Sequence, residues 1–173
     1  MLPFLAAVLA GAASGAGAAD VQLSDVPAMF QATCLDGQAR LRSSEVSPIS
    51  FDQLPPALKQ SLGQPASGKV WQINSAGRSY LYLLDYNAAP GVSPKVCGVA
   101  SETMDLKTAG DMLEARITGS VGRNRGRSAQ WLNAKDGYVA TATTASSLNV
   151  LQISWMSDTD RAAAEQQIEL MPK

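Results

Sequence analysis

Residues 69–100 constrain the fold more than any other part of this chain. They contain three stretches of strand character, at 70–74, 79–86 and 96–100, and Gly77 supplies a hairpin turn between the first two. In 79–86 the side chains of both faces are largely apolar or aromatic, which is typical of a strand inside a sheet. The segment therefore predicts an antiparallel sheet with 79–86 as a central strand.

The N-terminal residues have the pattern of an export signal. An apolar run at 2–9 precedes Ala- and Gly-rich sequence, and 16–18 fits the small-x-small cleavage motif. The run is too short to span about 30 Å of hydrocarbon, and no later stretch is long and apolar enough for a transmembrane helix. Because no Lys or Arg precedes Arg40, either the true start lies upstream or the amino terminus supplies the only positive charge. We expect a signal peptide at 1–19 and a single periplasmic or secreted domain at 20–173.

The chain has two cysteines, Cys34 and Cys97. In an oxidising compartment an even count predicts a disulfide, and two cysteines allow a single pairing. Cys34 follows Phe30 by four residues in a predicted helix, so both are expected to face the core. The bond would fasten this helix to the sheet, and the long loop that it closes should contribute about 4 kcal/mol. Two buried free thiols are the alternative.

The remaining segments complete an α+β pattern. We expect a helix between Asp25 and Gly37, and other helices capped by Asp105 and Asp158. The other expected helix lies at 55–62, and further strands lie at 130–132, 138–143 and 148–156. Residues 41–50, 64–69 and 118–128 are expected to be connectors. The strands follow one another in hairpins without βαβ alternation, so we expect about six mostly antiparallel strands flanked by about four helices.

Two helix-plus-three-strand units in the middle of the chain resemble each other. Trp71 stands six residues before Gly77, and Trp131 stands six before Gly137. A tyrosine follows each glycine at a strand position. An internal duplication would explain this, and so would the general likeness of small meanders.

Composition and charge exclude several functions. Lys and Arg total 14 and Asp and Glu total 15, so the chain lacks the basic balance of a dedicated nucleic-acid binder. The absence of histidine removes Ser-His-Asp and Cys-His catalysis and the histidine-based zinc motifs. The sequence contains no phosphate-binding loop and no dinucleotide fingerprint. We therefore expect no cofactor, no metal and no nucleic-acid partner.

Paired carboxylates remain a route to acid–base catalysis. The spacing of the candidates singles out no pair, and solvated acids and a helix cap account for them better. Asp85 shares a strand face with Leu81 and Leu83, so either that face opens to water at its end or Asp85 is paired. The candidates are Asp85, Glu102, Asp105 and Asp111.

A tyrosine set is one candidate recognition surface. Tyr80, Tyr82 and Tyr86 share a strand face and would offer contact area with hydrogen-bonding tips. The alternative is a sheet face covered by helices, with the hydroxyl groups reaching the rim.

An arginine cluster is the second candidate, for binding an anion. Arg123, Arg125 and Arg127 lie within the Gly-rich segment 118–128. Glycines let the backbone bend, so the guanidinium groups could converge on one phosphate or carboxylate of an envelope component. The alternative is a solvated loop whose charges aid solubility.

Several short motifs extend over most of the mature chain. They are Phe30-x-x-x-Cys34-Leu35 after the export segment, Trp71 opening a strand, Cys97-Gly98-Val99, and Trp131 followed by Asp136-Gly137-Tyr138 and the strand 148–155. In these motifs the sequence resembles an uncharacterised family of small secreted proteobacterial proteins. The resemblance implies an exported, disulfide-linked α+β domain and supplies no catalytic residues.

These observations favour a non-enzymatic, exported binding or envelope-associated domain. Its partner would be an anionic envelope component or a protein. The alternative is a carboxylate-based hydrolase that acts on an envelope polymer.

Overall fold

A computed structural model describes residues 25–37, 41, 43–74, 77–87, 89, 91–117, 121–125, 128–133 and 135–169. For residues 121–125 and 164–169 we describe the backbone alone. The expected export segment, residues 1–19, lies outside the described residues.

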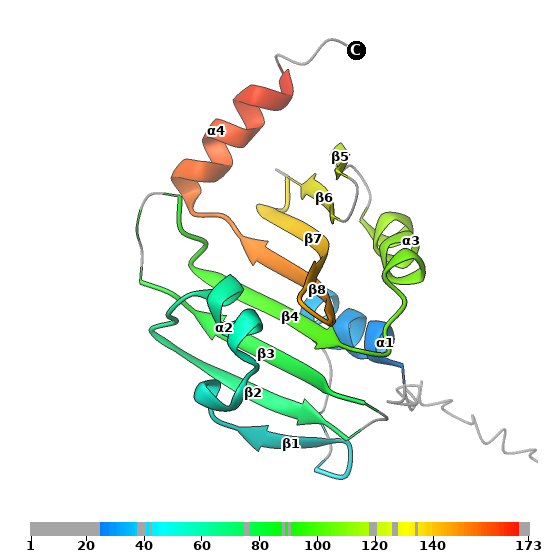
Figure 1. The fold of residues 1–173 in the computed structure, drawn as a ribbon. Coiled ribbons are helices and arrows are strands. Elements are labelled where there is room, and N and C mark those ends of the chain that lie inside the picture. Colours follow the sequence, from blue (N-terminus) through cyan, green and yellow to red (C-terminus); the bar gives the residue numbers. More distant parts are fainter. Residues whose placement is uncertain are drawn as a thin grey trace, which may run out of the picture.

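In the described residues, eight strands form one sheet in which every neighbouring pair is antiparallel (Figure 1). The strands are β1 Val46–Ile49, β2 Ser67–Ile73, β3 Ser79–Asp85, β4 Lys95–Ser101, β5 Val121–Arg125, β6 Ser128–Asn133, β7 Tyr138–Ala145 and β8 Leu148–Trp155. Their order is β1-β2-β3-β4-β8-β7-β6-β5. The sheet therefore consists of a first meander, β1–β4, and a second meander, β5–β8, which join where β4 pairs with β8.

The antiparallel α+β prediction is confirmed, but the expectation of about six strands is wrong. The two strands that the sequence did not predict are β1 and β5, which are the two edges of the sheet. β1 contains Pro48, and β5 has the sequence Val-Gly-Arg-Asn-Arg, so neither shows the apolar pattern of an inner strand. An edge strand has a neighbour on one side only, so proline and charge are tolerated there.

Helices pack on both faces of the sheet. They are α1 Val26–Phe30, which continues into the π-helix η1 Gln31–Leu35, the 3₁₀ turn η2 Phe51–Gln53, α2 Pro56–Leu62, α3 Leu106–Arg116 and α4 Asp158–Glu169. Figure 1 shows α2 in front of the sheet, α1 and α3 behind it, and α4 extending away from the end of β8. No helix within the described ranges is long and apolar enough to cross a membrane.

The two faces have separate cores. On the disulfide face, α1, η1 and α3 cover a core that includes Phe30, Cys34, Cys97, Leu113 and Trp131. On the opposite, tyrosine face, η2 and α2 cover a core that includes Leu58, Tyr80, Tyr82, Leu84 and Val150. Alternating side chains of the inner strands supply both cores, as the sequence of 79–86 predicts.

The predicted disulfide is confirmed. Cys34 of η1 and Cys97 of β4 are bonded, with their Cα atoms 5.5 Å apart and a separation of 63 positions in the sequence. Both side chains are buried. The bond holds the N-terminal helix against an inner strand of the sheet.

The helix caps follow the sequence in part. The backbone N–H of Thr108 donates to the Asp105 carboxylate at 2.7 Å, so Asp105 caps α3 as predicted. At α4 the prediction is wrong by one residue: the hydroxyl oxygen of Ser157 accepts from the backbone N–H of Asp160 at 3.2 Å. Ser157, which precedes Asp158, acts as the N-cap because its short hydroxyl side chain also reaches the first unpaired N–H groups of a helix.

Candidate functional site

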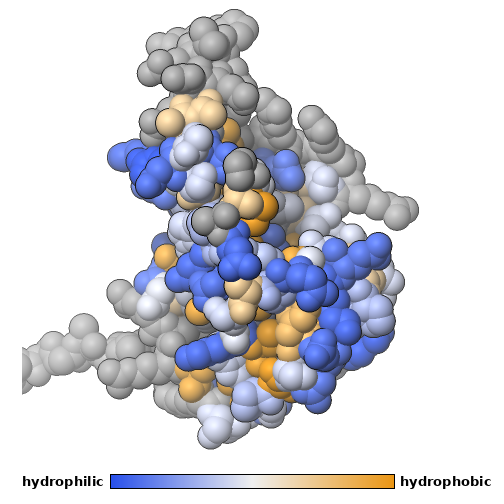
Figure 2. Space-filling view, turned by 90° about the vertical axis from the view of Figure 1, so that its left-hand side faces the viewer, coloured by the Kyte–Doolittle hydropathy of each residue, from blue (hydrophilic) through white to orange (hydrophobic). Residues whose placement is uncertain are grey.

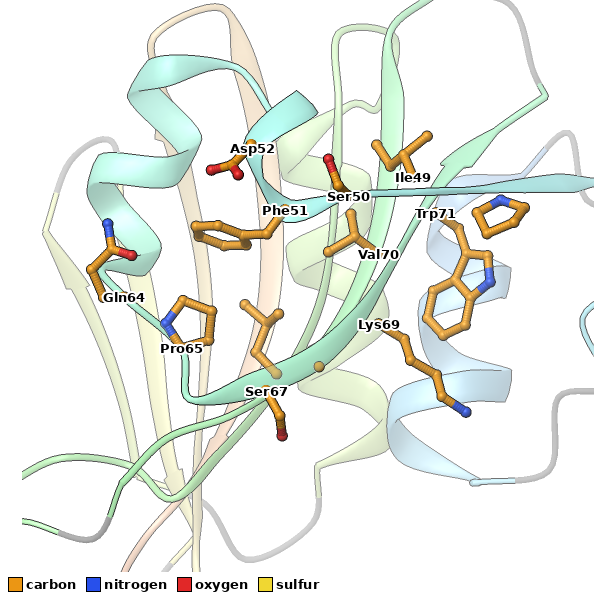
Figure 3. Close-up of a pocket in the computed structure, with 13 residues that line it drawn as sticks. Ile49, Ser50, Phe51, Asp52, Gln64, Pro65, Ser67, Lys69, Val70 and Trp71 are labelled. Carbon is orange, nitrogen blue, oxygen red and sulfur yellow. The ribbon is translucent and has the colours of Figure 1, made fainter.

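A pocket of approximately 500 Å³ lies at the β1 edge of the sheet, and we call it the edge pocket. It is formed where β1 ends, η2 begins and β2 starts (Figure 3). Its lining residues are Pro48, Ile49, Ser50, Phe51, Asp52, Gln64, Pro65, Ser67, Gly68, Lys69, Val70, Trp71 and Leu84.

Local hydrogen bonds hold η2 in place above the pocket. The backbone N–H of Ser50 donates to the Gln53 side-chain oxygen at 2.7 Å, which is half of a capping box. The Lys59 ammonium donates to the backbone carbonyl of Asp52 at 3.1 Å. These contacts fix the turn that carries Phe51 and Asp52.

The start of β2 forms the floor of the pocket and is tied to β3. The Ala66 N–H donates to the Asp85 carbonyl at 2.8 Å, and the Ser67 hydroxyl donates to the Asp85 carboxylate at 3.3 Å. A Cβ at Gly68 would lie 2.6 Å from the carbonyl oxygen of Leu83. Glycine is therefore required for the close approach of these two strands.

The pocket has an apolar centre with opposite charges around it. In Figure 3, Phe51, Pro65 and Val70 gather on one side of β2, whereas Lys69 extends on the other side. Val70 is buried, Phe51 and Pro65 are half-buried, and Asp52 and Lys69 are exposed. Figure 2, which views the molecule from the left of Figure 1, shows hydrophobic surface in its lower part bordered by hydrophilic surface.

The chemistry of the edge pocket suits binding better than catalysis. Asp52 is the single carboxylate among the thirteen lining residues, so the pocket holds no acid–base pair. The Ser67 hydroxyl is occupied as a donor to Asp85. Within the described residues, no cluster of three or more His, Cys, Asp or Glu side chains could hold a metal ion.

Each of the carboxylates singled out in the sequence has a local structural role. Glu102 pairs with Arg78, whose guanidinium Nε donates at 2.8 Å and keeps the pKa of Glu102 below its usual value. Asp111 pairs with Lys107 at 2.7 Å, and Asp105 is the α3 cap. Asp85 is exposed at the end of β3 and accepts from Ser67, so its strand face opens to water there.

The tyrosine set is a covered sheet face and not an exposed recognition surface. Tyr80 and Tyr82 are buried, and Tyr86 is half-buried with its hydroxyl donating to the Leu62 carbonyl of α2 at 2.7 Å. Burial raises the pKa of Tyr86 to about 12 and raises the pKa of Tyr82 further still. The Tyr82 hydroxyl donates to the Gln152 side chain at 3.0 Å.

The arginine cluster lies at the opposite edge of the sheet from the edge pocket. Arg123 and Arg125 belong to β5, where they stand opposite Gln130 and Ser128, so this part of segment 118–128 is a strand and not a loop. Arg127 lies outside the described residues. Whether the three guanidinium groups converge stays a prediction.

A second pocket, of approximately 350 Å³, lies beside the disulfide on the other face of the sheet. Asp36 and Asp136 line it together with Arg116 and Tyr138. Asp136 accepts from the side-chain amide of the buried Asn133 at 2.9 Å. This pocket therefore brings together two carboxylates that the sequence reasoning did not select.

The edge pocket itself was missed from the sequence. Residues 41–50 and 64–69 were expected to be connectors, yet they supply β1 and the start of β2. The one local signal was Ser50-x-x-Gln53, a capping-box pattern that predicts a helical turn at η2.

Comparisons with protein-family models, with curated proteins and with solved structures found no match to this chain.

Proposed function

We propose that this chain is an exported, non-enzymatic binding domain, periplasmic or secreted, and that the edge pocket is its ligand site. The composition of the pocket carries the proposal: an apolar centre at Phe51, Val70 and Leu84, with one carboxylate and one ammonium group among the lining side chains. Pockets of this kind take ligands with an apolar body, and the few polar groups orient them.

The cross-link supports the exported part of the proposal. A buried disulfide that joins Cys34 to Cys97 is typical of oxidising compartments such as the periplasm or the extracellular space. The export-like sequence at 1–19 and the resemblance to small secreted proteins favour the same location.

An apolar dye tests the pocket directly. The mature protein should increase the fluorescence of N-phenyl-1-naphthylamine, and Phe51→Ser should weaken the binding roughly tenfold, because fully burying such a side chain is worth about 1.5–3 kcal/mol. Val92→Ser is the matched control, since Val92 is an exposed apolar side chain outside the pocket. Thermal unfolding should show both variants folded at the assay temperature. Equal dye binding by Phe51→Ser and the wild type would contradict the proposal.

The alternative function is a carboxylate-based hydrolase of an envelope polymer, and the second pocket is the observation in its favour. Asp36 and Asp136 line the same cavity, as a pair of acid–base groups would. The test is release of soluble fragments from purified peptidoglycan by the mature protein and by Asp36→Asn and Asp136→Asn. Release that both substitutions abolish would favour the hydrolase, and no release by the wild type would favour the binding domain.

A further inference from the structure

The floor of the second pocket is the end row of the sheet on the disulfide face. Trp155 of β8 stands opposite Tyr138 of β7, and Ile153 precedes Trp155 by two residues and so shares its face. All three line the pocket, and Tyr138 and Trp155 are half-buried. Lys95 of β4 pairs with Trp155 on the other side, where its ammonium group lies 5.3 Å from the centre of the indole ring. The floor therefore offers an apolar, aromatic surface to a ligand.

Three other elements supply the charged walls of the second pocket. Asp36 directly follows η1, Arg116 is the last residue of α3, and Asp136 lies in the turn between β6 and β7. All three residues are exposed. Two carboxylates and one guanidinium group, carried by three separate parts of the chain, thus border one cavity.

These opposite charges do not neutralise one another. Among the described residues, neither Asp36 nor Asp136 forms an ion pair with Arg116. Arg116 has a neutral partner, because Gln31, with its amide oxygen turned toward α3, accepts from the guanidinium Nε at 3.1 Å. The side-chain partner of Asp136 is the amide of Asn133, which is neutral as well. Each charge therefore keeps its capacity to pair with a ligand group of opposite sign.

A buried amide fixes two polar groups of the pocket. Asn133 is 2% exposed, and its side-chain nitrogen donates to the Asp136 carboxylate at 2.9 Å and to the Tyr138 hydroxyl at 3.2 Å. Its side-chain oxygen accepts from the backbone N–H of Asp136 at 2.9 Å. The carboxylate and the hydroxyl are therefore held in position before a ligand binds, which lowers the entropic cost of binding.

A ligand that complements this pocket carries both charges and an apolar body. A carboxylate suits Arg116, because a guanidinium group can donate to it through two parallel N–H groups. An ammonium group has three donors, and the carboxylates of Asp36 and Asp136 are acceptors for them. An apolar side chain suits the floor at Trp155 and Tyr138. A free α-amino acid with a large apolar side chain has all three parts.

We propose that the second pocket binds a free α-amino acid with a large apolar side chain. The carboxylate of the amino acid pairs with Arg116, its ammonium group pairs with Asp36 and Asp136, and its side chain packs on Trp155. This inference goes beyond the proposed function, which concerns the edge pocket. It gives the two aspartates a binding role in place of the acid–base role that a hydrolase would require.

Isothermal titration calorimetry with the mature, disulfide-bonded protein tests the inference. The probe is L-phenylalanine, and phenethylamine and 3-phenylpropionate are the same molecule without the carboxylate and without the ammonium group. Each should bind roughly tenfold more weakly than phenylalanine, because it loses one charge-assisted pairing. L-serine keeps both charges but lacks the apolar body, so it should also bind roughly tenfold more weakly. Absence of phenylalanine binding at about 10 mM, or equal binding of the three phenyl compounds, would overturn the inference.

Single substitutions test which wall pairs with which end of the ligand. Arg116→Gln should weaken phenylalanine binding roughly tenfold and should not weaken phenethylamine binding, since phenethylamine has no carboxylate. Asp136→Asn should weaken the binding of phenethylamine and not that of 3-phenylpropionate. Glu114→Gln is the matched control, because Glu114 is exposed on α3 outside the pocket, and it should bind phenylalanine like the wild type. An equal loss for phenylalanine and phenethylamine in Arg116→Gln would overturn the pairing and, with it, the inference.

Discussion

The two meanders of the sheet share their connectivity and differ in their side chains. The difference is visible in one row of residues that stand opposite each other on neighbouring strands and project to the tyrosine face. In the first meander this row consists of Val70, Tyr82 and Gly98, which are all buried. Gly98 belongs to β4 and so lies at the seam, where β4 pairs with β8. In the second meander the row continues with Gln152, Thr141 and Gln130, which are half-buried or exposed.

The difference follows from what covers each half. In the first meander, β3 is apolar on both faces because it contributes side chains to the core of the disulfide face on one side and to the core of the tyrosine face on the other. In the second meander, β7 directs Ala140 and Ala142 at the disulfide face and Thr141 and Thr143 at the opposite face. Apolar surface is worth about 25 cal/mol per Å² only where it leaves water, so the first meander should hold most of the stability.

The largest expected effect concerns the cross-link of the first meander. Replacing both Cys34 and Cys97 with alanine should lower the free energy of unfolding by about 4 kcal/mol, because the unfolded chain regains the entropy of a long open loop. Urea unfolding monitored by circular dichroism measures the change. Wild-type protein in reductant should behave like the double variant. Matching unfolding midpoints in oxidised wild type and double variant would show that the bond does not stabilise the first meander.

A pair of glycine substitutions compares the seam with a covering helix. A Cβ at Gly98 would collide with the Tyr82 ring and lie 2.7 Å from the Leu151 carbonyl, so Gly98→Ala should destabilise by about 1–3 kcal/mol. At Gly110 of α3 the nearest atom would be Trp131 at an ordinary 3.6 Å. Gly110→Ala should therefore stabilise by about 0.5–1 kcal/mol, because alanine has the better helix propensity. Thermal unfolding of both variants should give shifts of opposite sign.

The tyrosines of the first meander predict loss of stability at high pH. Burial raises the pKa of Tyr86 from 10.0 to about 12 and also raises the pKa of Tyr82. The stability that the neutral phenols contribute is complete below pH 10 and is lost as the pH rises, because the unfolded chain ionises first. Unfolding midpoints measured from pH 8 to 12 should fall above pH 10. Tyr86→Phe should fall less steeply over that range, and an identical slope in both proteins would exclude this tyrosine as a cause.

The smallest expected change in stability lies at the outer strand of the second meander. Changing Arg123, Arg125 and Arg127 to glutamine should alter the free energy of unfolding by less than about 0.5 kcal/mol, as surface substitutions usually do. The anion-binding hypothesis predicts that the same variant loses binding to vesicles containing phosphatidylglycerol, and that added salt weakens binding by the wild type. Co-sedimentation with vesicles measures both. Unchanged binding by the variant would identify the cluster as a solvated surface.

The inner parts of the fold could be predicted because burial restricts their residue types. The side chains of 79–86 are apolar or aromatic on both faces, which predicted that β3 is buried on both sides. The spacing of Phe30 and Cys34 predicted that the cysteine faces the core. Two cysteines allow one bond, so the cross-link could be predicted from the expectation of an oxidising compartment. The covered tyrosine face followed from the number of helices that need a surface to pack on.

The edge strands and the edge pocket could not be predicted, because positions without a neighbouring strand do not restrict the residue type in this way. Pro48 and the arginines of β5 are tolerated because an edge strand has no neighbour on its outer side, so no apolar period marks it. The edge pocket is assembled from η2 and from β2, which are separated by α2 in the sequence. The place where the β1 ladder stops is a property of the register and not of any one residue.

The seam between the meanders also sets an order of events in time. A chain that emerges from its amino terminus presents Cys34 and Cys97 early, so the cross-link can form before the second meander exists. The partner of Cys97 in the sheet is Ile153 of β8, near the end of the chain. Until β8 arrives, β4 is an apolar edge that can pair with another molecule, and such distant pairing is slow. The last of the described strands to be made is thus the one that covers the apolar edge of β4.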